Sequence, residues 1–238
     1  MKPAQSYVIC CVQRTGSWLL AHTLTDTGYA GRPYDYFDEG ERKTHTREWG
    51  LPRVDLDSYI QAVRDHATTP NGVLGSKLMW NDFDRLGAHA GADAGLEFMR
   101  TAFGDPQFVW LRRRDKVRQG ISWWRAVATS QWALRPDQEA GQPAADLERI
   151  LPFVRLAQQC EDGWRQWFAA TGIQPCEVVY EDLARERLTV ANRVLGFLRL
   201  PLLDADSLPP VRYRQQADRL TDRYVDLVRA RNHDGGTS

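Results

Sequence analysis

Residues 6–28, SYVICCVQRTGSWLLAHTLTDTG, decide how the chain folds. Tyr7–Val12 is a short, almost continuous apolar run rich in β-branched side chains, which is typical of a buried parallel strand. The polar turn Gln13–Ser17 interrupts this run. Apolar residues then recur at three- and four-residue spacing up to Leu24, which predicts a helix that ends at Gly28. Strand, turn and helix in this order present free backbone N–H groups and the positive end of a helix to an anion.

The turn itself carries groups suited to an anion. Gly16 allows close approach of the backbone, Ser17 can cap the helix or bond an anion oxygen, and Arg14 supplies charge. The turn lacks the first glycine and the lysine of a Walker loop, and GxGxxG is absent. It therefore indicates a phosphate-like anion without specifying a nucleotide. The alternative is an ordinary corner in which Ser17 caps the helix and Arg14 is solvated.

Charge and composition exclude several classes of function. The 238 residues include 31 basic and 31 acidic side chains, so no overall field attracts nucleic acid or an anionic membrane. Apolar runs are too short for a membrane span and the N-terminus lacks a signal-peptide layout, so we expect a cytoplasmic protein with no membrane or nucleic-acid partner. The cysteines have no metal-binding spacing and suggest no disulfide framework; they are Cys10, Cys11, Cys160 and Cys176.

Strands and helices alternate along the rest of the chain. We expect further strands at Val73–Trp80, Phe108–Leu111 and Cys176–Tyr180. Helices are expected at Asp57–His66, Phe83–Ala102, Lys116–Thr129, Asp146–Ala170 (kinked or restarted at Pro152), Leu183–Leu200 and Arg219–Arg231. Between them, we interpret Tyr29–Phe37 as an edge strand or loop, and Glu39–Glu48 and Gln131–Ala145 as exposed loops. The pattern predicts one α/β domain over residues 1–231, with a mostly parallel sheet covered by helices on both faces and a disordered tail at 232–238.

Polar groups follow several of these strands. Parallel sheets bind ligands beyond the carboxyl ends of their strands, where the first turn, Lys77, the arginines 112–114 and Tyr180 would share one rim. Lys77 is then a cation held at the end of the sheet, or else an edge lysine that reaches solvent. The crowded arginines favour an anionic ligand, although a solvated cluster is the alternative. The tryptophans in helical patterns fit core packing, or the wall of a ring-binding site.

Several motifs together resemble the PAPS-dependent sulfotransferase superfamily, and within it the trehalose 2-sulfotransferase-like subgroup. The motifs are QRTGSWLL, GYAGRPYDYF, PNGVLGSKLMWND, LRRRDKVRQGISWWRA, EDGWRQWF and RQQADR, and they occur in the family's order. The resemblance covers most of the chain. It implies a P-loop-NTPase-like sulfotransferase fold and PAPS (3′-phosphoadenosine-5′-phosphosulfate) as sulfuryl donor, with no metal.

The resemblance also implies a role for each matching residue on the donor side. Arg113 and Ser122 match the pair that holds the 3′-phosphate, with Arg114 as a competing candidate, and Tyr180 lies near the adenosine. The late loop 214–218, with Arg214 and Gln216, closes over the nucleotide. The 5′-phosphosulfate is cradled by Arg14, Thr15, Gly16, Ser17 and Trp18.

On the acceptor side, the resemblance makes Asp35 the general base, while Arg14 and Lys77 offset charge on the bridging oxygen. Asp35 stands where the subgroup has a glutamate. The expected acceptor is a hydroxyl of a small metabolite or sugar, in specialised metabolism where the sulfate acts as a leaving group. A homodimer, a heteromer with a pathway enzyme and a carrier-linked substrate all remain open. The residues that match the acceptor side are Gln13, Arg32, Pro33, Tyr34, Tyr36, Phe37 and Trp49.

Two other functions compete with an active sulfotransferase. One is a non-catalytic protein of the same fold that binds nucleotide or scaffolds a partner enzyme. The other is a small-molecule kinase, which the absence of a lysine after Gly16 disfavours.

Overall fold

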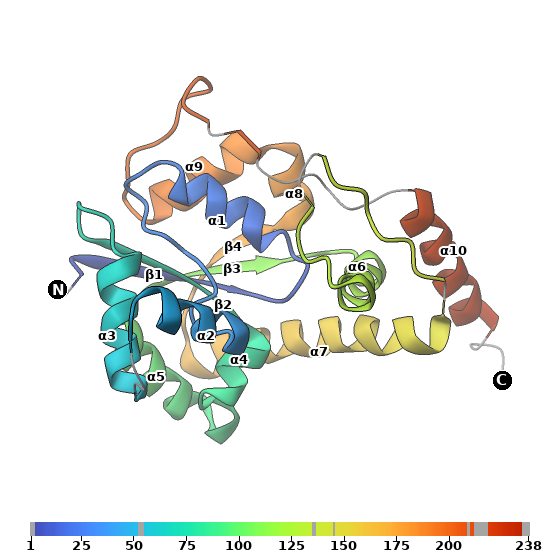
Figure 1. Cartoon of the computed structure of the whole chain (residues 1–238), viewed down its shortest axis with the longest axis horizontal. Coiled ribbons are helices and arrows are strands. Elements are labelled where there is room, and N and C mark those ends of the chain that lie inside the picture. Colours follow the sequence, from blue (N-terminus) through green and yellow to red (C-terminus); the bar gives the residue numbers. More distant parts are fainter. Residues whose placement is uncertain are drawn as a thin grey trace.

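A parallel four-stranded sheet forms the centre of the molecule in a computed structural model, which describes residues 3–51, 55–134, 137–144, 146–208, 210–211 and 219–234. The strand order is β2-β1-β3-β4, so the first strand lies inside the sheet, between β2 and β3 (Figure 1). All three strand pairings are parallel, as the alternation of strands and helices predicts. The strands are β1 (Gln5–Cys11), β2 (Val73–Met79), β3 (Gln107–Arg112) and β4 (Cys176–Val179).

Helices cover both faces of this sheet (Figure 1). Successive strand residues point to opposite faces, so adjacent Cys10 and Cys11 belong to different cores. Cys10 packs in the core formed with α3 (Leu56–Ala67), α5 (Ala92–Phe103) and α7 (Leu147–Thr171). Cys11 packs in the core formed with α1 (Ser17–Thr25), α8 (Tyr180–Arg185) and α9 (Arg187–Phe197). The predicted three-layer α/β fold is confirmed.

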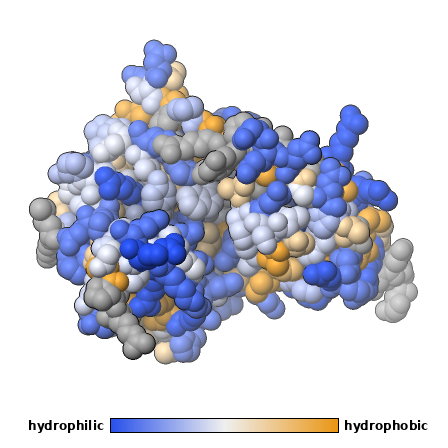
Figure 2. Space-filling view, in the orientation of Figure 1, coloured by the Kyte–Doolittle hydropathy of each residue, from blue (hydrophilic) through white to orange (hydrophobic). Residues whose placement is uncertain are grey.

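A third core lies beyond the carboxyl ends of the strands. There α6 (Lys116–Thr129) packs on the first half of α7 and on α10 (Arg219–Asp234), through residues that include Trp124, Ile150 and Tyr224. Figure 1 shows this group of helices at the right, away from the sheet. Seen from the same side, the surface is mostly hydrophilic (Figure 2). Within the described part of the chain, every helix is too short or too polar to cross a bilayer.

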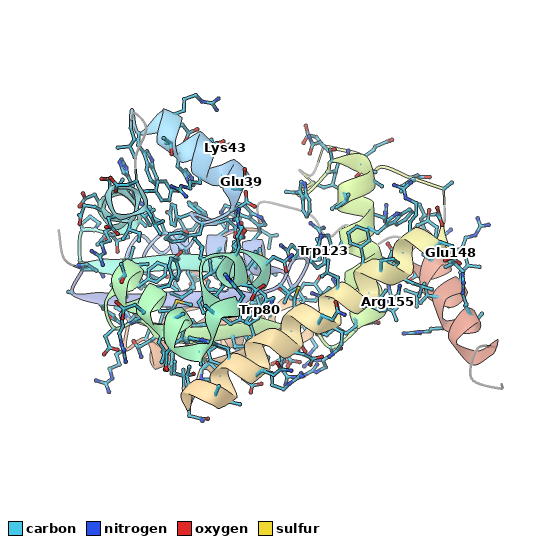
Figure 3. All side chains as sticks on the ribbon, turned by 90° about the horizontal axis from the view of Figure 1, so that it is seen from below. Glu39, Lys43, Trp80, Trp123, Glu148 and Arg155 are labelled. Atoms are coloured by element: carbon cyan, nitrogen blue, oxygen red, sulfur yellow. The ribbon has the colours of Figure 1, made fainter. Side chains whose placement is uncertain are left out.

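The polar segment 39–48 is a helix, α2 (Glu39–Glu48), so its prediction as a loop was wrong. Its charge density hid ordinary helix signals. Asp38 caps the first turn by accepting bonds from the backbone N–H groups of Gly40 and Glu41, and basic side chains occupy the last turn. None of its residues is buried, and Glu39 and Lys43 pair on its outer face (Figure 3). The helix therefore lies at the surface, with one side half-buried through residues that include Arg42 and His45.

Several other helices are interrupted at positions that differ from those expected from the sequence. The segment 83–102 divides into α4 (Trp80–Arg85), a 3₁₀ turn (Ala88–Ala90) and α5. The helix expected at 183–200 is two helices, α8 and α9, separated at Glu186, and Tyr180 begins α8 rather than ending β4. By contrast, α7 runs without a break through Pro152.

Most of the tryptophans that lie in helical patterns pack in the cores. Trp124, Trp164 and Trp167 are buried, while Trp132 is half-exposed. The Trp164 ring stacks on Phe83, with centroids 4.8 Å apart, and its indole N–H donates a 2.9 Å bond to the carbonyl of Cys11. This bond ties α7 to the last residue of β1.

We predict that Gly163→Ala destabilises the protein. Trp80 lies against α7 (Figure 3), and a Cβ on Gly163 would meet its Cε2 at 2.2 Å. Overpacking of this kind costs about 1–3 kcal/mol of unfolding free energy. Gly196→Ala in α9 is the matched control, because its Cβ would come no closer than 3.8 Å to Leu202; it should be neutral or stabilising by up to about 1 kcal/mol. Urea denaturation measures both, and equal effects would contradict the packing argument.

Candidate active site

The turn after β1 has the backbone of an anion cradle. Arg14 and Gly16 both have left-handed backbone angles, with φ of 66° and 77°, and turns of this kind orient N–H groups toward a common centre. The carbonyls of the turn are bonded to groups of the protein. The Gln13 carbonyl accepts a 2.8 Å bond from Gln119, and the Arg14 carbonyl accepts a 3.0 Å bond from Arg113. The Val12 carbonyl accepts a bond from the buried Thr15 hydroxyl, so Thr15 stabilises the turn from its buried side.

A cavity of about 330 Å³ opens in front of this turn. Gly16, Ser17 and Trp18 line it, together with Ser122 and Tyr180. None of its described lining residues is acidic. Five arginines line it: Arg14, Arg113, Arg118, Arg125 and Arg187. The cavity therefore favours a ligand with several negative charges.

The Arg14 side chain joins the turn after β1 to α6 and to the segment that follows α6. Its Nε donates a 2.9 Å bond to the Ser122 hydroxyl and its Nη1 donates a 2.5 Å bond to the Trp132 carbonyl. Burial and the neighbouring Arg113 lower the pKa of Arg14 to about 10. Burial likewise lowers the pKa of Arg113. An anion in the cavity would relieve both effects, because it would favour the charged guanidinium groups.

Arg113 and Arg114 point in different directions. The Arg113 side chain is 9% exposed, lines the cavity and lies 4.6 Å from the centroid of the Tyr180 ring. Arg114 is 57% exposed and forms a two-pronged ion pair with Asp182 on α8, at 3.1 and 2.6 Å. Geometry therefore favours Arg113 over Arg114 as the residue that contacts a ligand in the cavity.

The Tyr180 ring packs directly against the first turn. A Cβ on Gly16 would meet Tyr180 Cδ2 at 2.3 Å. Gly16 is therefore required by its left-handed backbone and by this close contact.

Asp35 and Lys77 form a buried ion pair beside the cavity. The distance from Lys77 Nζ to Asp35 Oδ2 is 2.7 Å, and the side chains are 0% and 12% exposed. Lys77 Nζ lies 4.0 Å from the centroid of the Trp18 ring, which lines the cavity. Lys77 is thus neither solvated nor directed to solvent. Burial raises the pKa of Asp35 although Lys77 opposes the shift, and Asp35 Oδ1 has no hydrogen-bond partner among the described residues.

The remaining acceptor-side residues differ in how accessible they are. Trp49 stacks on His45 and on His66, with centroids 4.7 and 4.3 Å away, and is half-buried. Phe37 is buried against the aromatic core, and buried Tyr36 donates to the Arg32 carbonyl. Because of these contacts, fewer residues of the acceptor-side segment 32–49 can contact a ligand than the sequence suggests.

The rest of the acceptor side ranges from buried to exposed residues. Tyr34 bridges to Ser76 of β2 and is half-buried, while Pro33 is buried. Arg32 is exposed and donates to the His66 carbonyl. Gln13 Oε1 has no partner among the described residues.

Sequence reasoning missed part of the cavity wall. Arg118, Ser122 and Arg125 are spaced by four and three residues and so share one face of α6, a signal that could have placed both arginines with Ser122. Arg187 of α9 also lines the cavity, but no spacing in the sequence relates it to the other cavity residues. The expected exposed loop at 131–145 lines the cavity through Trp132, and Leu134 is buried. Arg214 and Gln216 lie outside the described residues.

Comparison with known proteins identifies the class. The Stf0 sulphotransferase family matches residues 6–231, so the chain belongs to this family. It is 32% identical, over 96% of both chains, to the trehalose 2-sulfotransferase of Mycobacterium tuberculosis (strain ATCC 35801 / TMC 107 / Erdman). It is also 32% identical, over 94% of both, to that of Mycolicibacterium smegmatis (strain ATCC 700084 / mc(2)155). A sulfotransferase structure from Alicyclobacillus acidocaldarius shares the fold, with a TM-score of 0.50 at 13% identity over 95% of this chain and 92% of that one. The chain is a sulfotransferase of the trehalose 2-sulfotransferase-like type.

We predict that Asp82, near Asp35, makes stability depend on pH. Burial, and then Asp38, raise its pKa to about 7, although Arg85 donates a 2.8 Å bond to it. The folded state holds this proton more tightly than the unfolded state, so the contribution to unfolding free energy falls as pH rises from about 4 to 7. Asp82→Asn should raise the unfolding free energy by about 1–3 kcal/mol near pH 8 and change it little near pH 4. Urea denaturation across this range measures it, and a pH-independent difference would contradict the assignment.

Proposed function

We propose that the protein transfers the sulfuryl group of PAPS to a hydroxyl of a small metabolite or sugar, giving a sulfate ester and PAP (3′-phosphoadenosine-5′-phosphate). The observation that carries this proposal is the cavity, in which arginines from the turns after β1 and β3 face one space. PAPS has a phosphosulfate at one end and a 3′-phosphate at the other, so it presents charge to both turns. Membership of the sulfotransferase family supports the same donor.

In this proposal the donor lies along the cavity wall. The N–H groups of the first turn and the first turn of α1 bind the phosphosulfate, with Ser17 and Trp18 beside it. Arg113 and Ser122 bind the 3′-phosphate, and the Tyr180 ring packs near the adenosine. Arg14, which bonds Ser122, lies between the two ends.

The reaction is an in-line displacement at sulfur. The acceptor oxygen forms a bond to sulfur while the bond from sulfur to the bridging oxygen of PAPS breaks, and that oxygen leaves on PAP. Catalysis rests on positioning and on stabilising the charge that develops on the leaving oxygen. Arg14 and the N–H groups of the turn supply this stabilisation. The step requires no metal.

Asp35 accepts the proton of the acceptor hydroxyl. Lys77 holds Oδ2. In this proposal Oδ1, which is buried and has no partner among the described residues, takes the proton once the acceptor has displaced the groups that cover it. Its raised pKa makes it a stronger base than an exposed aspartate. Lys77 lies on the Asp35 side of the Trp18 ring, so it acts on the leaving oxygen less directly than Arg14.

A sugar is the first acceptor to test, because the curated relatives are named for trehalose. Asp35 is shorter than the glutamate that the subgroup uses, so the acceptor must approach more closely. Gln13, Tyr34 and the edge of Trp49 are the groups placed to contact it. We further propose that the reaction serves specialised metabolism in the cytoplasm, where sulfation turns a hydroxyl into a leaving group. Measuring PAP release with trehalose and a panel of hydroxyl metabolites tests the acceptor.

The second candidate is a non-catalytic subunit that binds nucleotide without transferring sulfate. The observation that favours it is the tight pairing of Asp35 with Lys77, which would hold Asp35 in place without a reaction. Tight PAP binding without PAP release for any acceptor would support this function, and release with one acceptor would exclude it.

Arg113→Ala should weaken PAP binding by about 10- to 100-fold, because it removes a charge-assisted contact from a buried site. Arg114→Ala is the control, since its side chain pairs with Asp182 outside the cavity, and it should change the affinity less than about twofold. Titration calorimetry with PAP measures both. If Arg114→Ala has the larger effect, the assignment of the 3′-phosphate is wrong.

Asp35→Asn should lower the transfer rate by about 2 to 4 orders of magnitude, because the amide cannot accept the proton. Affinity for PAP should stay within about threefold, since Asp35 lies outside the cavity. Single-turnover measurement of sulfate ester formation, with PAP binding measured in parallel, separates the two effects. Unchanged transfer would remove Asp35 as the base.

A further inference from the structure

A second buried ion pair, between Lys116 and Glu161, lies outside the cavity. Lys116 begins α6 and Glu161 lies midway along α7. Their side chains are 15% and 5% exposed, and Lys116 Nζ lies 2.5 Å from Glu161 Oε2. Neither residue lines the cavity. Burying two charges costs desolvation free energy even when they pair, so the question is what this pair contributes to the protein.

Lys116 connects Glu161 to the turn after β3. Its ammonium donates to the carbonyl of Arg113 and, at 3.4 Å, to the side-chain oxygen of Gln119. Gln119, which is fully buried, donates in turn to the Gln13 carbonyl in the turn after β1. Lys116 and Gln119, both at the start of α6, therefore each hold a carbonyl of one of the two basic turns, which are the arginine-containing turns after β1 and β3.

The residues next to Glu161 hold the same region from α7. Three positions on, Trp164 donates to the carbonyl of Cys11, which ends β1. Between them, Gly163 leaves room for Trp80. The stretch 161–164, EDGW, thus contacts the end of β1 directly and reaches both basic turns through Lys116. The transfer chemistry uses none of these residues.

We propose that Glu161 is a positioning residue that acts through Lys116 to keep the carbonyls of both basic turns directed into the protein, so that their N–H groups and arginines face the donor. This inference rests on the proposed function for its ligand. Arg165 places a second positive charge at this pair, with its Nη2 3.4 Å from Glu161 Oε1. Without Glu161, the ammonium of Lys116 would lose its buried counter-ion and would move toward solvent. This movement would release the Arg113 carbonyl.

The test compares Glu161→Gln with Asp162→Asn. The first removes the buried charge and keeps the shape. The second is the control on the same helix, since Asp162 is 36% exposed and shares Arg165 with Glu161 but forms no ion pair with Lys116 among the described residues. Titration calorimetry should show PAP affinity about 10-fold weaker for Glu161→Gln, as expected when binding groups are misplaced, and changed less than about twofold for Asp162→Asn.

A double-mutant cycle tests whether Glu161 acts through Lys116. Lys116→Met should weaken PAP binding as Glu161→Gln does, and the double variant should be no weaker than Lys116→Met alone. Additive losses would overturn the proposed route. If Glu161→Gln does not fold, the comparison of Lys116→Met with Asp162→Asn decides the question.

Hydrogen exchange without nucleotide separates this proposal from the proposed function. Backbone amides of residues 13–18 and 113–116 should exchange faster in Glu161→Gln than in the parent or in Asp162→Asn, while exchange in α9 stays the same. Failure of the parent protein to bind PAP would refute the proposed donor, and exchange would still decide the role of Glu161. Unchanged exchange in both turns would refute the positioning role.

Discussion

Two guanidinium groups that share one cavity, Arg14 half-buried and Arg113 buried, are the constraint on which the site depends. They come from turns about 100 residues apart in the chain, and Arg113 makes the charge of Arg14 less favourable. The fold holds them together because each is bonded to a neutral oxygen, of Ser122 for Arg14 and of the Arg14 carbonyl for Arg113. The free protein therefore keeps an electrostatic cost that a multiply charged ligand relieves on binding.

This constraint explains why so many contacts around the site go to carbonyl oxygens. A peptide that turns its carbonyl toward an anion repels it, so an anion cradle requires its carbonyls to be held elsewhere. Thr15, Gln119, Arg113, Lys116 and Trp164 hold the carbonyls of the two turns and of the end of β1. On the acceptor side Lys77 holds one oxygen of Asp35, while the other oxygen is buried without a hydrogen-bond partner among the described residues.

The sequence predicted the layers and the rim of the sheet because these follow from short-range patterns. Apolar runs that end in basic turns predicted β1 and β3. Helical spacing predicted α6 with the correct first and last residues. The helix α2 was missed because it is solvent-exposed and has no apolar face, the signal on which helix prediction depends. The pairing of Lys77 with Asp35 and of Lys116 with Glu161 could not be predicted, since each joins residues that only the tertiary fold brings together.

Donor and acceptor sides are anchored from different elements, and this difference bears on how specificity can change. The donor turns are fixed by hydrogen bonds and charges from α6 and α7. The acceptor segment 29–49 is held by aromatic packing, by the Lys77–Asp35 pair and by hydrogen bonds from β1, β2 and α3, among them those of Tyr7 to the Ala30 carbonyl and of Tyr59 to the Tyr36 carbonyl, while α2 buries no residue. Substitutions there leave the donor contacts in place. A family built this way can keep one sulfuryl donor and vary the hydroxyl that receives the group.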